Sequence, residues 1–279
     1  MQSSFDEENF KLPFSLKNIQ AVRLCMALLE TNFSIHFNKE DSAILEYLND
    51  FFPLDYKIGT ENIYQIDRIS FNHQVPSCSI GNIEKTLIFP HGITNRCKSF
   101  WPQIKSYDFV FSGLITQKRA ATLNRWLENN FEQIFKIKTF QRNYTIFSKL
   151  LSYFTIKRSQ YFSKKNNVLF FSSSKGREWP VKAWDEKYYI NLSKSKYVLC
   201  PDGDFIWTYR FFEALLCGAI PIIENYCSDY EGFFFYTMDD KIENMYYDEN
   251  KVQSNFNKAV DYLTIPKKLL NREIINLLS

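Results

Sequence analysis

The spacing of apolar positions changes twice between residues 195 and 225, and these changes predict a strand, a helix and a second strand. A short apolar run at residues 197–200 ends at Pro201, where the turn-forming sequence Pro-Asp-Gly-Asp begins. After Thr208, which suits a helix N-cap, apolar residues recur at i,i+4 spacing. Gly218 suits the left-handed position after a helix, and a second apolar run follows it. This order predicts a βαβ unit, and hence a parallel sheet that binds ligands at the carboxyl ends of its strands.

The same spacings predict helices and strands elsewhere in the chain. Helices are predicted at residues 19–30, 40–51, 116–135 and 255–263, and strands at residues 86–89, 109–111 and 168–171. Asn38 suits the N-cap of the second helix, and Pro53 stops it. Strands that alternate with helices predict an α/β fold. We place a domain junction within residues 91–105, where Pro102 lies among mixed polar residues.

Composition excludes several classes of function. With 279 residues and a 45% apolar fraction, the chain can form one large or two small domains. A net charge of +3 is too small to predict nucleic-acid binding. The sequence begins without the basic and apolar regions of a signal peptide and has no long apolar run, so we expect a cytoplasmic protein without a membrane span. Six cysteines without a C-x-x-C pair favour free thiols, and three scattered histidines argue against zinc.

Arg210 and Glu213 form the first candidate site. They lie three residues apart near the predicted helix start and therefore share one helical face. A guanidinium, a glycine loop and the positive end of a helix together suit a phosphate, while the carboxylate suits sugar hydroxyls. The structural alternative is an ordinary surface ion pair.

A second helix start that could bind phosphate follows Ser112 and Gly113. The helix predicted there presents Lys118, Arg119 and Arg125 on the side opposite its apolar positions. If the strands before both helices belong to one parallel sheet, the two loops meet at one crevice. The alternative is an ordinary solvated helix face.

Two polar stretches near these loops have two alternative interpretations each, a ligand-binding role and a structural role. The spacing Asp202-x-Asp204 matches the acidic pair with which some transferases hold Mg²⁺ or Mn²⁺, but aspartate is a common turn residue, and we expect no divalent metal. Residues 172–177, which include Arg177, could hold a phosphate or a base, or form a plain polar loop.

The segment around Arg210 resembles the exostosin-type glycosyltransferases of family 47. The matching positions are Ser195, Lys196, Tyr197, Cys200, Pro201, Gly203, Arg210, Glu213, Gly218, Pro221 and Ile222. Shorter matches lie at residues 86–91 and 109–113, the latter followed by Lys118 and Arg119, so that the resemblance covers residues 84–265. Residues 196–197, 202–203, 209–211 and 230–234 are also similar to protein O-glucosyltransferase-type enzymes.

The resemblance implies two Rossmann-like domains facing a cleft, the GT-B arrangement, and an inverting transfer from a nucleotide sugar to a glycan hydroxyl. It implies a UDP-sugar donor, with UDP-xylose expected first, and an oligosaccharide or glycoprotein acceptor. Residues 1–104 would bind the acceptor, residues 105–262 would bind the donor, and residues 263–279 would return to the first domain. The expected donor-binding residues are Ser112, Gly113, Lys118, Arg119, Arg125, Pro201, Gly203, Thr208, Arg210 and Glu213.

An inverting transfer needs a general base for the acceptor hydroxyl, and the first domain is its expected source. Asp67 follows an apolar, strand-like stretch and ranks first; His91 ranks second, and Asp55 and His73 are further candidates. Two other interpretations stay open. One is a noncatalytic nucleotide- or glycan-binding protein that lacks a base, and the other is a protein O-glucosyltransferase-type enzyme.

Overall fold

The computed structural model describes residues 9–59, 64–72, 74–132, 135–137, 158–163, 166–173 and 177–279. The chain is mixed α/β and divides into two compact units, each built on a parallel sheet. The first unit lies within residues 1–96, 179–184 and 260–279, and the second within residues 97–178 and 185–259. The functions that the resemblance assigns to the two halves stay predictions.

The first unit contains a four-stranded parallel sheet in the order β3-β2-β1-β4 and an antiparallel sheet in the order β5-β6-β7. The strands are β1 (Asn9–Lys11), β2 (Ser34–Phe37), β3 (Lys57–Ile58), β4 (Tyr64–Gln65), β5 (Ile69–Asn72), β6 (Ser77–Ile80) and β7 (Ile83–Lys85). The helices are α1 (Ile19–Leu29), the 3₁₀ turn η1 (Lys39–Asp41), α2 (Ser42–Asn49), the start of α3 (His91–Ser99) and α9 (Lys267–Leu278). The buried core includes Phe10, Leu24, Ile35, Leu48 and Phe89.

The two predicted N-terminal helices are present, but the cap predicted for the second one is wrong. Asn18 caps α1, because its side chain accepts a hydrogen bond from the Ala21 amide at 2.9 Å. Asn38 makes no such bond, since the turn η1 stands between it and α2. The carboxylate of Asp41 instead accepts a hydrogen bond from the Leu16 amide at 2.9 Å and ties the start of α2 to the loop after β1.

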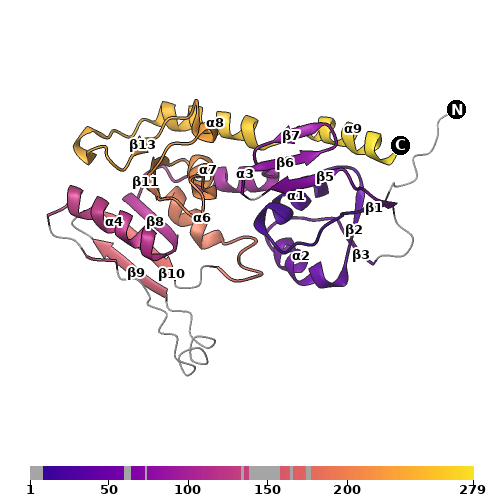
Figure 1. The fold of residues 1–279 in the computed structure, drawn as a ribbon, viewed down its shortest axis with the longest axis horizontal. Coiled ribbons are helices and arrows are strands. Elements are labelled where there is room, and N and C mark those ends of the chain that lie inside the picture. Colours follow the sequence, from indigo (N-terminus) through magenta and orange to yellow (C-terminus); the bar gives the residue numbers. More distant parts are fainter. Residues whose placement is uncertain are drawn as a thin grey trace, which may run out of the picture. The chain divides into compact units, whose positions relative to one another are not determined.

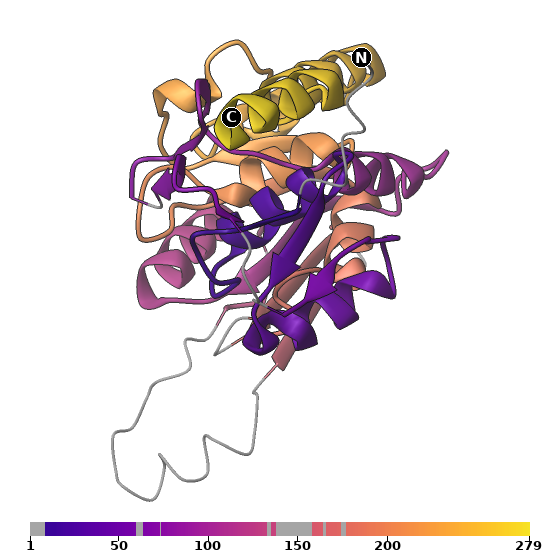
Figure 2. The ribbon, with the colours of Figure 1, turned by 90° about the vertical axis from the view of Figure 1, so that its right-hand side faces the viewer.

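The C-terminal helix α9, yellow in Figures 1 and 2, belongs to the first unit and runs beside the β6–β7 hairpin. The Glu273 carboxylate accepts a hydrogen bond from the Asn82 amide in the hairpin turn at 2.7 Å. A Cβ at Gly81, whose φ is +56°, would collide with Glu273, so the turn needs glycine for both its conformation and this contact. The hairpin and the C-terminal helix therefore pack together closely.

The second unit is built on a six-stranded sheet in the order β13-β12-β11-β8-β10-β9, of which all strands except β12 are labelled in Figure 1. The strands are β8 (Tyr107–Leu114), β9 (Arg158–Ser163), β10 (Val168–Ser173), β11 (Ser195–Cys200), β12 (Ile220–Ile223) and β13 (Tyr236–Thr237). The helices are α4 (Gln117–Asn130), α6 (Glu186–Ser193), α7 (Tyr209–Leu216), α8 (Glu249–Leu263) and the 3₁₀ turns η2 (Ser228–Tyr230) and η3 (Ile242–Asn244). Only β9 runs antiparallel to its neighbour.

The predicted βαβ unit is confirmed as β11, α7 and β12, with the two strands paired in parallel. Thr208 caps α7 by accepting a hydrogen bond from the Arg210 amide at 3.3 Å. Gly218 adopts a φ of 70°, the left-handed conformation expected after a helix. A Cβ there would also collide with the indole of Trp101, whose Nε1 donates to the Leu216 carbonyl at 3.0 Å. Glycine is therefore required at this position for two independent reasons.

Three helices in the second unit differ from the predictions. The helix predicted at residues 116–135 ends at Asn130, because Phe131 is extended with a φ of −143°. The helix predicted at 255–263 begins six residues earlier, at Glu249. Helix α6 was not predicted at all.

All six cysteines are free thiols, as predicted. Among the described residues, no helix is long and apolar enough to cross a bilayer.

Candidate functional site

The six-stranded sheet grows in both directions from β8. The chain places β10 on one side of β8 and then crosses to place β11 on the other side. In open parallel sheets, ligands bind outside the carboxyl ends of the strands at such a switch point. Here the carboxyl ends of β8 and β11 lead into the loops before α4 and α7. These are the two helix starts that the sequence singled out.

Arg119 links the carboxyl ends of β8 and β11. Its Nη1 donates to the Leu114 carbonyl at 3.1 Å, and its Nε donates to the Asp202 carbonyl at 2.9 Å. A Cβ at Gly203 would lie 2.7 Å from Arg119 Nη2, so glycine allows the guanidinium to lie against the loop. Burial, and then the charge of Arg210, lower the pKa of Arg119 to about 10. The two arginine charges are thus close enough to interact.

Arg210 is the second guanidinium of the site, and it is only 7% exposed. Its Nε donates to the Ser112 carbonyl at 3.1 Å, and its guanidinium carbon lies 4.5 Å from the centre of the Phe111 ring. A Cβ at Gly113 would collide with Nη2. Within the part of the chain that the structure describes, the buried Nη1 has no hydrogen-bond partner. A buried donor of this kind is costly unless a ligand or water satisfies it.

Asp202 lies on the same loop and is 3% exposed. Its Oδ2 accepts a hydrogen bond from Asn225 Nδ2 at 2.7 Å and lies 3.4 Å from Lys118 Nζ. Its backbone amide donates to Glu224 Oε2 at 3.0 Å, and Glu224 Oε1 accepts from the Thr122 hydroxyl at 2.9 Å. Side chains that follow β8 and β12 therefore hold the Asp202 loop in place.

Glu213 lies among side chains and away from solvent, since it is 2% exposed. Its two carboxylate oxygens accept hydrogen bonds from the hydroxyls of Tyr188 at 2.6 Å and Tyr189 at 3.1 Å. The guanidinium of Arg177 stacks on Tyr188 at 4.3 Å from the ring centre. Burial alone would lower the pKa of Arg177, but the Glu213 carboxylate and the nearby tyrosines raise it overall. Glu213 thus anchors a buried cluster, and its expected contact with sugar hydroxyls stays a prediction.

The structure brings most of the predicted donor-binding residues together. Ser112 contributes its carbonyl, Thr208 caps α7, and Pro201 is buried at the end of β11. Arg125 is exposed and lies eight residues beyond the start of α4, about 12 Å along the helix. That distance separates it from the helix start at which the other residues gather.

The sequence analysis missed Asn225 and Glu224, which approach Asp202 from the end of β12. The signal that could have found them is their position, because they directly follow the second strand of the predicted βαβ unit. Tyr188 and Tyr189 were missed because α6 was missed. Residues 174–176 of the polar stretch lie outside the described residues, as does His73.

Asp67 lies just beyond β4, and β4 takes part in a second switch point. In the first unit the chain places β2 and β3 on one side of β1 and then β4 on the other. Asp67 follows the carboxyl end of β4 by two residues and is exposed, and its Oδ1 accepts a hydrogen bond from Gln65 Nε2 at 2.9 Å. The Ile66 amide donates to the Lys11 carbonyl, which holds this segment beside the end of β1. Asp67 therefore has the position expected of a ligand-binding residue in this sheet.

His91 begins α3, and both its backbone amide and its ring are held by hydrogen bonds. Glu30 accepts hydrogen bonds from the amides of His91 at 2.9 Å and Gly92 at 2.6 Å, and so caps the helix. The imidazole Nε2 lies 3.1 Å from the Ile265 carbonyl, where it acts as a donor. This contact fixes the ring, while its role as a base stays a prediction.

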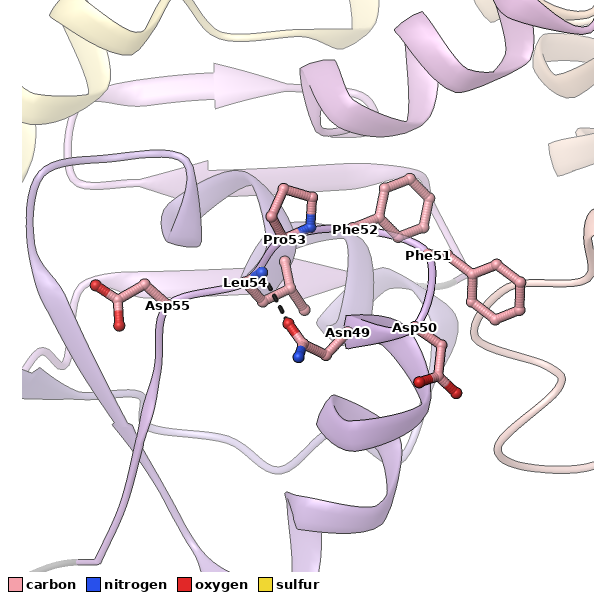
Figure 3. A pocket seen from close by; sticks show the side chains of 7 residues that line it. All are labelled: Asn49, Asp50, Phe51, Phe52, Pro53, Leu54 and Asp55. Atoms are coloured by element: carbon pink, nitrogen blue, oxygen red, sulfur yellow. Dashed lines mark hydrogen bonds between the residues drawn. The ribbon is translucent and has the colours of Figure 1, made fainter.

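Asp55 lines a pocket of 580 Å³ on the loop after α2, shown in Figure 3. Asp50 and Asp55 lie at opposite ends of the loop, and the Leu54 amide donates to Asn49 Oδ1 at 3.0 Å. The ring of Phe52 packs against Trp184 with 5.0 Å between ring centres. The pocket belongs to the first unit and is distinct from the arginine site.

Among the described residues, no group of three or more His, Cys, Asp or Glu side chains could hold a metal ion. What gathers at the switch point of the six-stranded sheet is Arg119, Arg210 and Lys118, with Asp202 among them. This set can bind an anion, and it offers an acceptor to a neutral donor beside that anion.

Comparisons with known proteins add little to this geometry. No family model and no curated protein sequence matches the chain. A solved structure described as "Crystal structure of GtfA/B complex" is similar with a TM-score of 0.35 and 11% identity, over 88% of this chain and 45% of that chain. The present chain thus spans less than half of the length of the solved chain that it matches, and a TM-score this low does not establish a shared fold.

Proposed function

We propose that the protein is an inverting glycosyltransferase that moves a sugar from a UDP-sugar donor, with UDP-xylose expected first, to a hydroxyl of an oligosaccharide or glycoprotein. In this proposal the two units act as the Rossmann-like halves of a GT-B-type enzyme: the second binds the donor and the first binds the acceptor. The exostosin-like motif order supports the class of reaction. The observation that carries the proposal is Arg210 Nη1, a buried donor without a partner among the described residues, at the switch point of the sheet.

The chain offers positive groups for the leaving diphosphate. Arg210 and Arg119 lie at the ends of β8 and β11, and the N-terminal end of α7 adds backbone dipoles that favour negative charge. In the transfer, negative charge grows on the diphosphate as its bond to the anomeric carbon breaks. Guanidiniums fixed in advance by backbone carbonyls stabilise that charge without first having to reorient. We therefore propose a reaction that does not depend on a divalent metal.

The acceptor hydroxyl must lose a proton as its oxygen bonds to the anomeric carbon. We assign this proton to the carboxylate of Asp67, which is exposed at the switch point of the first unit's sheet. The electron pair of the broken bond leaves with the UDP. The new glycosidic bond forms on the face opposite the leaving group, so the configuration inverts.

Replacing Arg210 tests the donor site directly. We expect Arg210→Ala to weaken UDP binding roughly 10- to 100-fold in calorimetry, because a charge-assisted hydrogen bond is lost. Arg210→Lys should retain part of the affinity, since an ammonium keeps the charge but not the planar fork. Arg272→Ala, which removes an exposed arginine from α9, is the matched control and should bind UDP as the wild type does. Unchanged UDP affinity in a folded Arg210→Ala variant would contradict the proposal.

A further inference from the structure

Asp202 holds an oxygen that the fold leaves unused. Its Oδ2 is occupied by Asn225 and Lys118, and its backbone amide and carbonyl are bonded to Glu224 and Arg119. Its Oδ1 is buried and, among the described residues, has no hydrogen-bond partner. Asp202 is thus held by four contacts, two on Oδ2 and two on its backbone, while Oδ1 presents one free acceptor.

The second buried carboxylate of the site is arranged in the opposite way. Both oxygens of Glu213 accept hydrogen bonds from tyrosine hydroxyls, at 2.6 and 3.1 Å. A ligand hydroxyl could reach Glu213 only by displacing a buried tyrosine. Of the two buried acids on the β11–α7 segment, only Asp202 has an acceptor to offer.

We propose that Asp202 Oδ1 accepts a hydrogen bond from a hydroxyl of the same ligand whose diphosphate Arg210 binds. This assignment rests on the proposed function. It makes Asp202, and not Glu213, the residue that recognises a ligand hydroxyl. The unpartnered donor of Arg210 and the unpartnered acceptor of Asp202 call for one ligand that carries both an anion and a hydroxyl. A nucleoside diphosphate and its sugar ester both have that chemistry.

A neutral hydroxyl suits this oxygen better than a cation does. Lys118 Nζ already lies 3.4 Å from Oδ2, and the guanidinium of Arg119 donates to the carbonyl of the same residue. These positive charges repel a divalent ion but do not repel a hydroxyl. Lys118 is 60% exposed, so its ammonium can move aside when a ligand enters.

The experiment compares Asp202→Asn with wild type against four probes: inorganic pyrophosphate, UDP, 2′,3′-dideoxy-UDP and UDP-xylose. The amide can keep its bond with Asn225 through its oxygen, and it then presents an NH₂ group where Oδ1 was. Asp204→Asn is the matched control, since it removes the same charge from an exposed residue two positions away. Thermal melting of each variant shows whether it is folded.

If the hydroxyl belongs to the ribose, wild type should bind UDP roughly 10- to 100-fold more tightly than dideoxy-UDP. Asp202→Asn should remove that preference without weakening pyrophosphate, and Asp204→Asn should retain it. If the hydroxyl belongs to the transferred sugar, wild type binds UDP and dideoxy-UDP equally, and Asp202→Asn weakens UDP-xylose by the same factor while leaving UDP unchanged. The wild-type comparison of the two nucleotides requires no variant, so poor folding of Asp202→Asn does not remove the test of a ribose contact.

Three results would overturn the inference. If a folded Asp202→Asn variant has the same relative affinities for all these ligands as wild type, Oδ1 does not bind a ligand hydroxyl. UDP binding that Mn²⁺ strengthens in wild type but not in Asp202→Asn makes Oδ1 a metal ligand instead. In both cases Arg210 would still be needed for pyrophosphate, and the proposed glycosyl transfer would stand. In the second case its independence of a divalent metal would not. If wild type binds neither pyrophosphate nor any of the nucleotides, the proposed function fails and this inference fails with it.

Discussion

At the scale of single residues, Asp67 is notable for how little holds it. It is exposed beyond the end of β4, and the hydrogen bond from Gln65 leaves its second oxygen available. The carboxylates of Asp202, Glu213 and Glu30, by contrast, each hold part of the fold together. A general base must be accessible to the substrate hydroxyl whose proton it takes. Asp67 meets this requirement, and we therefore test it first.

We expect Asp67→Asn to lower kcat roughly 10²- to 10⁴-fold, the usual contribution of a general base, with little change in the affinity for UDP. The assay is the release of UDP from a panel of UDP-sugars with glycan acceptors. Asp239→Asn, at an exposed aspartate in a turn, serves as the control for the loss of a charge. A full rate in Asp67→Asn would exclude it as the base and make His91 the next candidate. No turnover by wild type with any donor would favour the noncatalytic binding protein.

Sequence reasoning located Arg210 and Arg119 because their positions follow from local order: each comes at a helix start after a strand and a glycine. It did not foresee the surroundings of Glu213, because the spacing of Arg210 and Glu213 shows that they share a helix face but not what covers that face. The cover is α6, whose tyrosines occupy the carboxylate. Helix α6 lies far from this position along the chain, and its own apolar pattern is weak.

At the scale of elements, helix α3 begins at a carboxylate supplied from outside it. Glu30, directly after α1, accepts both of the first amides of α3. A negative charge at this end of a helix also interacts favourably with the helix dipole. The contact ties two helices that lie 61 residues apart in the chain.

We predict that Glu30→Gln lowers the free energy of unfolding by about 1–2 kcal/mol, because it replaces two charge-assisted hydrogen bonds with neutral ones. The measurement is urea denaturation at pH 7. Glu46→Gln, on the exposed side of α2, should change stability by less than about 0.5 kcal/mol. Equal effects in the two variants would show that the cap at α3 does not matter.

The elements that the sequence predicted well are those whose apolar positions alone decide their structure. The strands of the βαβ unit are buried at every position except Lys196, and their apolar runs show it. The short strands of the first unit contain two to four residues, too few for any periodicity to show. The start of α8 was missed for another reason. Its first residues are polar, and apolar residues recur at helical spacing only in its later part.

At the scale of the whole molecule, several cysteine thiols and tyrosine hydroxyls are buried in their protonated form. Burial raises the pKa of the thiols of Cys78 and Cys200 to about 12, and that of the Tyr247 hydroxyl to about 12. Each folded pKa lies above its unfolded value, so the stabilising contribution is complete below the unfolded pKa and is lost as the pH rises toward the folded one. The contribution of Lys105 to stability changes with pH in the opposite direction, because burial lowers its pKa to about 8. Its contribution therefore increases as the pH rises above about 8.

We therefore predict that the protein loses stability between pH 9 and pH 12, most steeply above pH 10, where tyrosines of the unfolded chain also ionise. Each buried thiol contributes about 1.4 kcal/mol per pH unit in this window. The denaturant midpoint should fall across this range, and Cys200→Ala should show a shallower slope than wild type. A midpoint that stays constant or rises to pH 11 would contradict the prediction.

The first unit is assembled from three separate stretches of chain, within residues 1–96, 179–184 and 260–279. A ribosome delivers these stretches in order, so every residue of the second unit has been synthesised before the last stretch of the first unit exists. The usual sequence of co-translational folding, with the N-terminal body completed first, is thus reversed for this chain. Until the ribosome has added α9, Asn82 and the hairpin beside it lack the partner that covers them in the finished protein. Leu270 and Ile274 of α9 are buried in the finished protein, so the apolar surface that they cover stays exposed in the nascent chain until α9 is added.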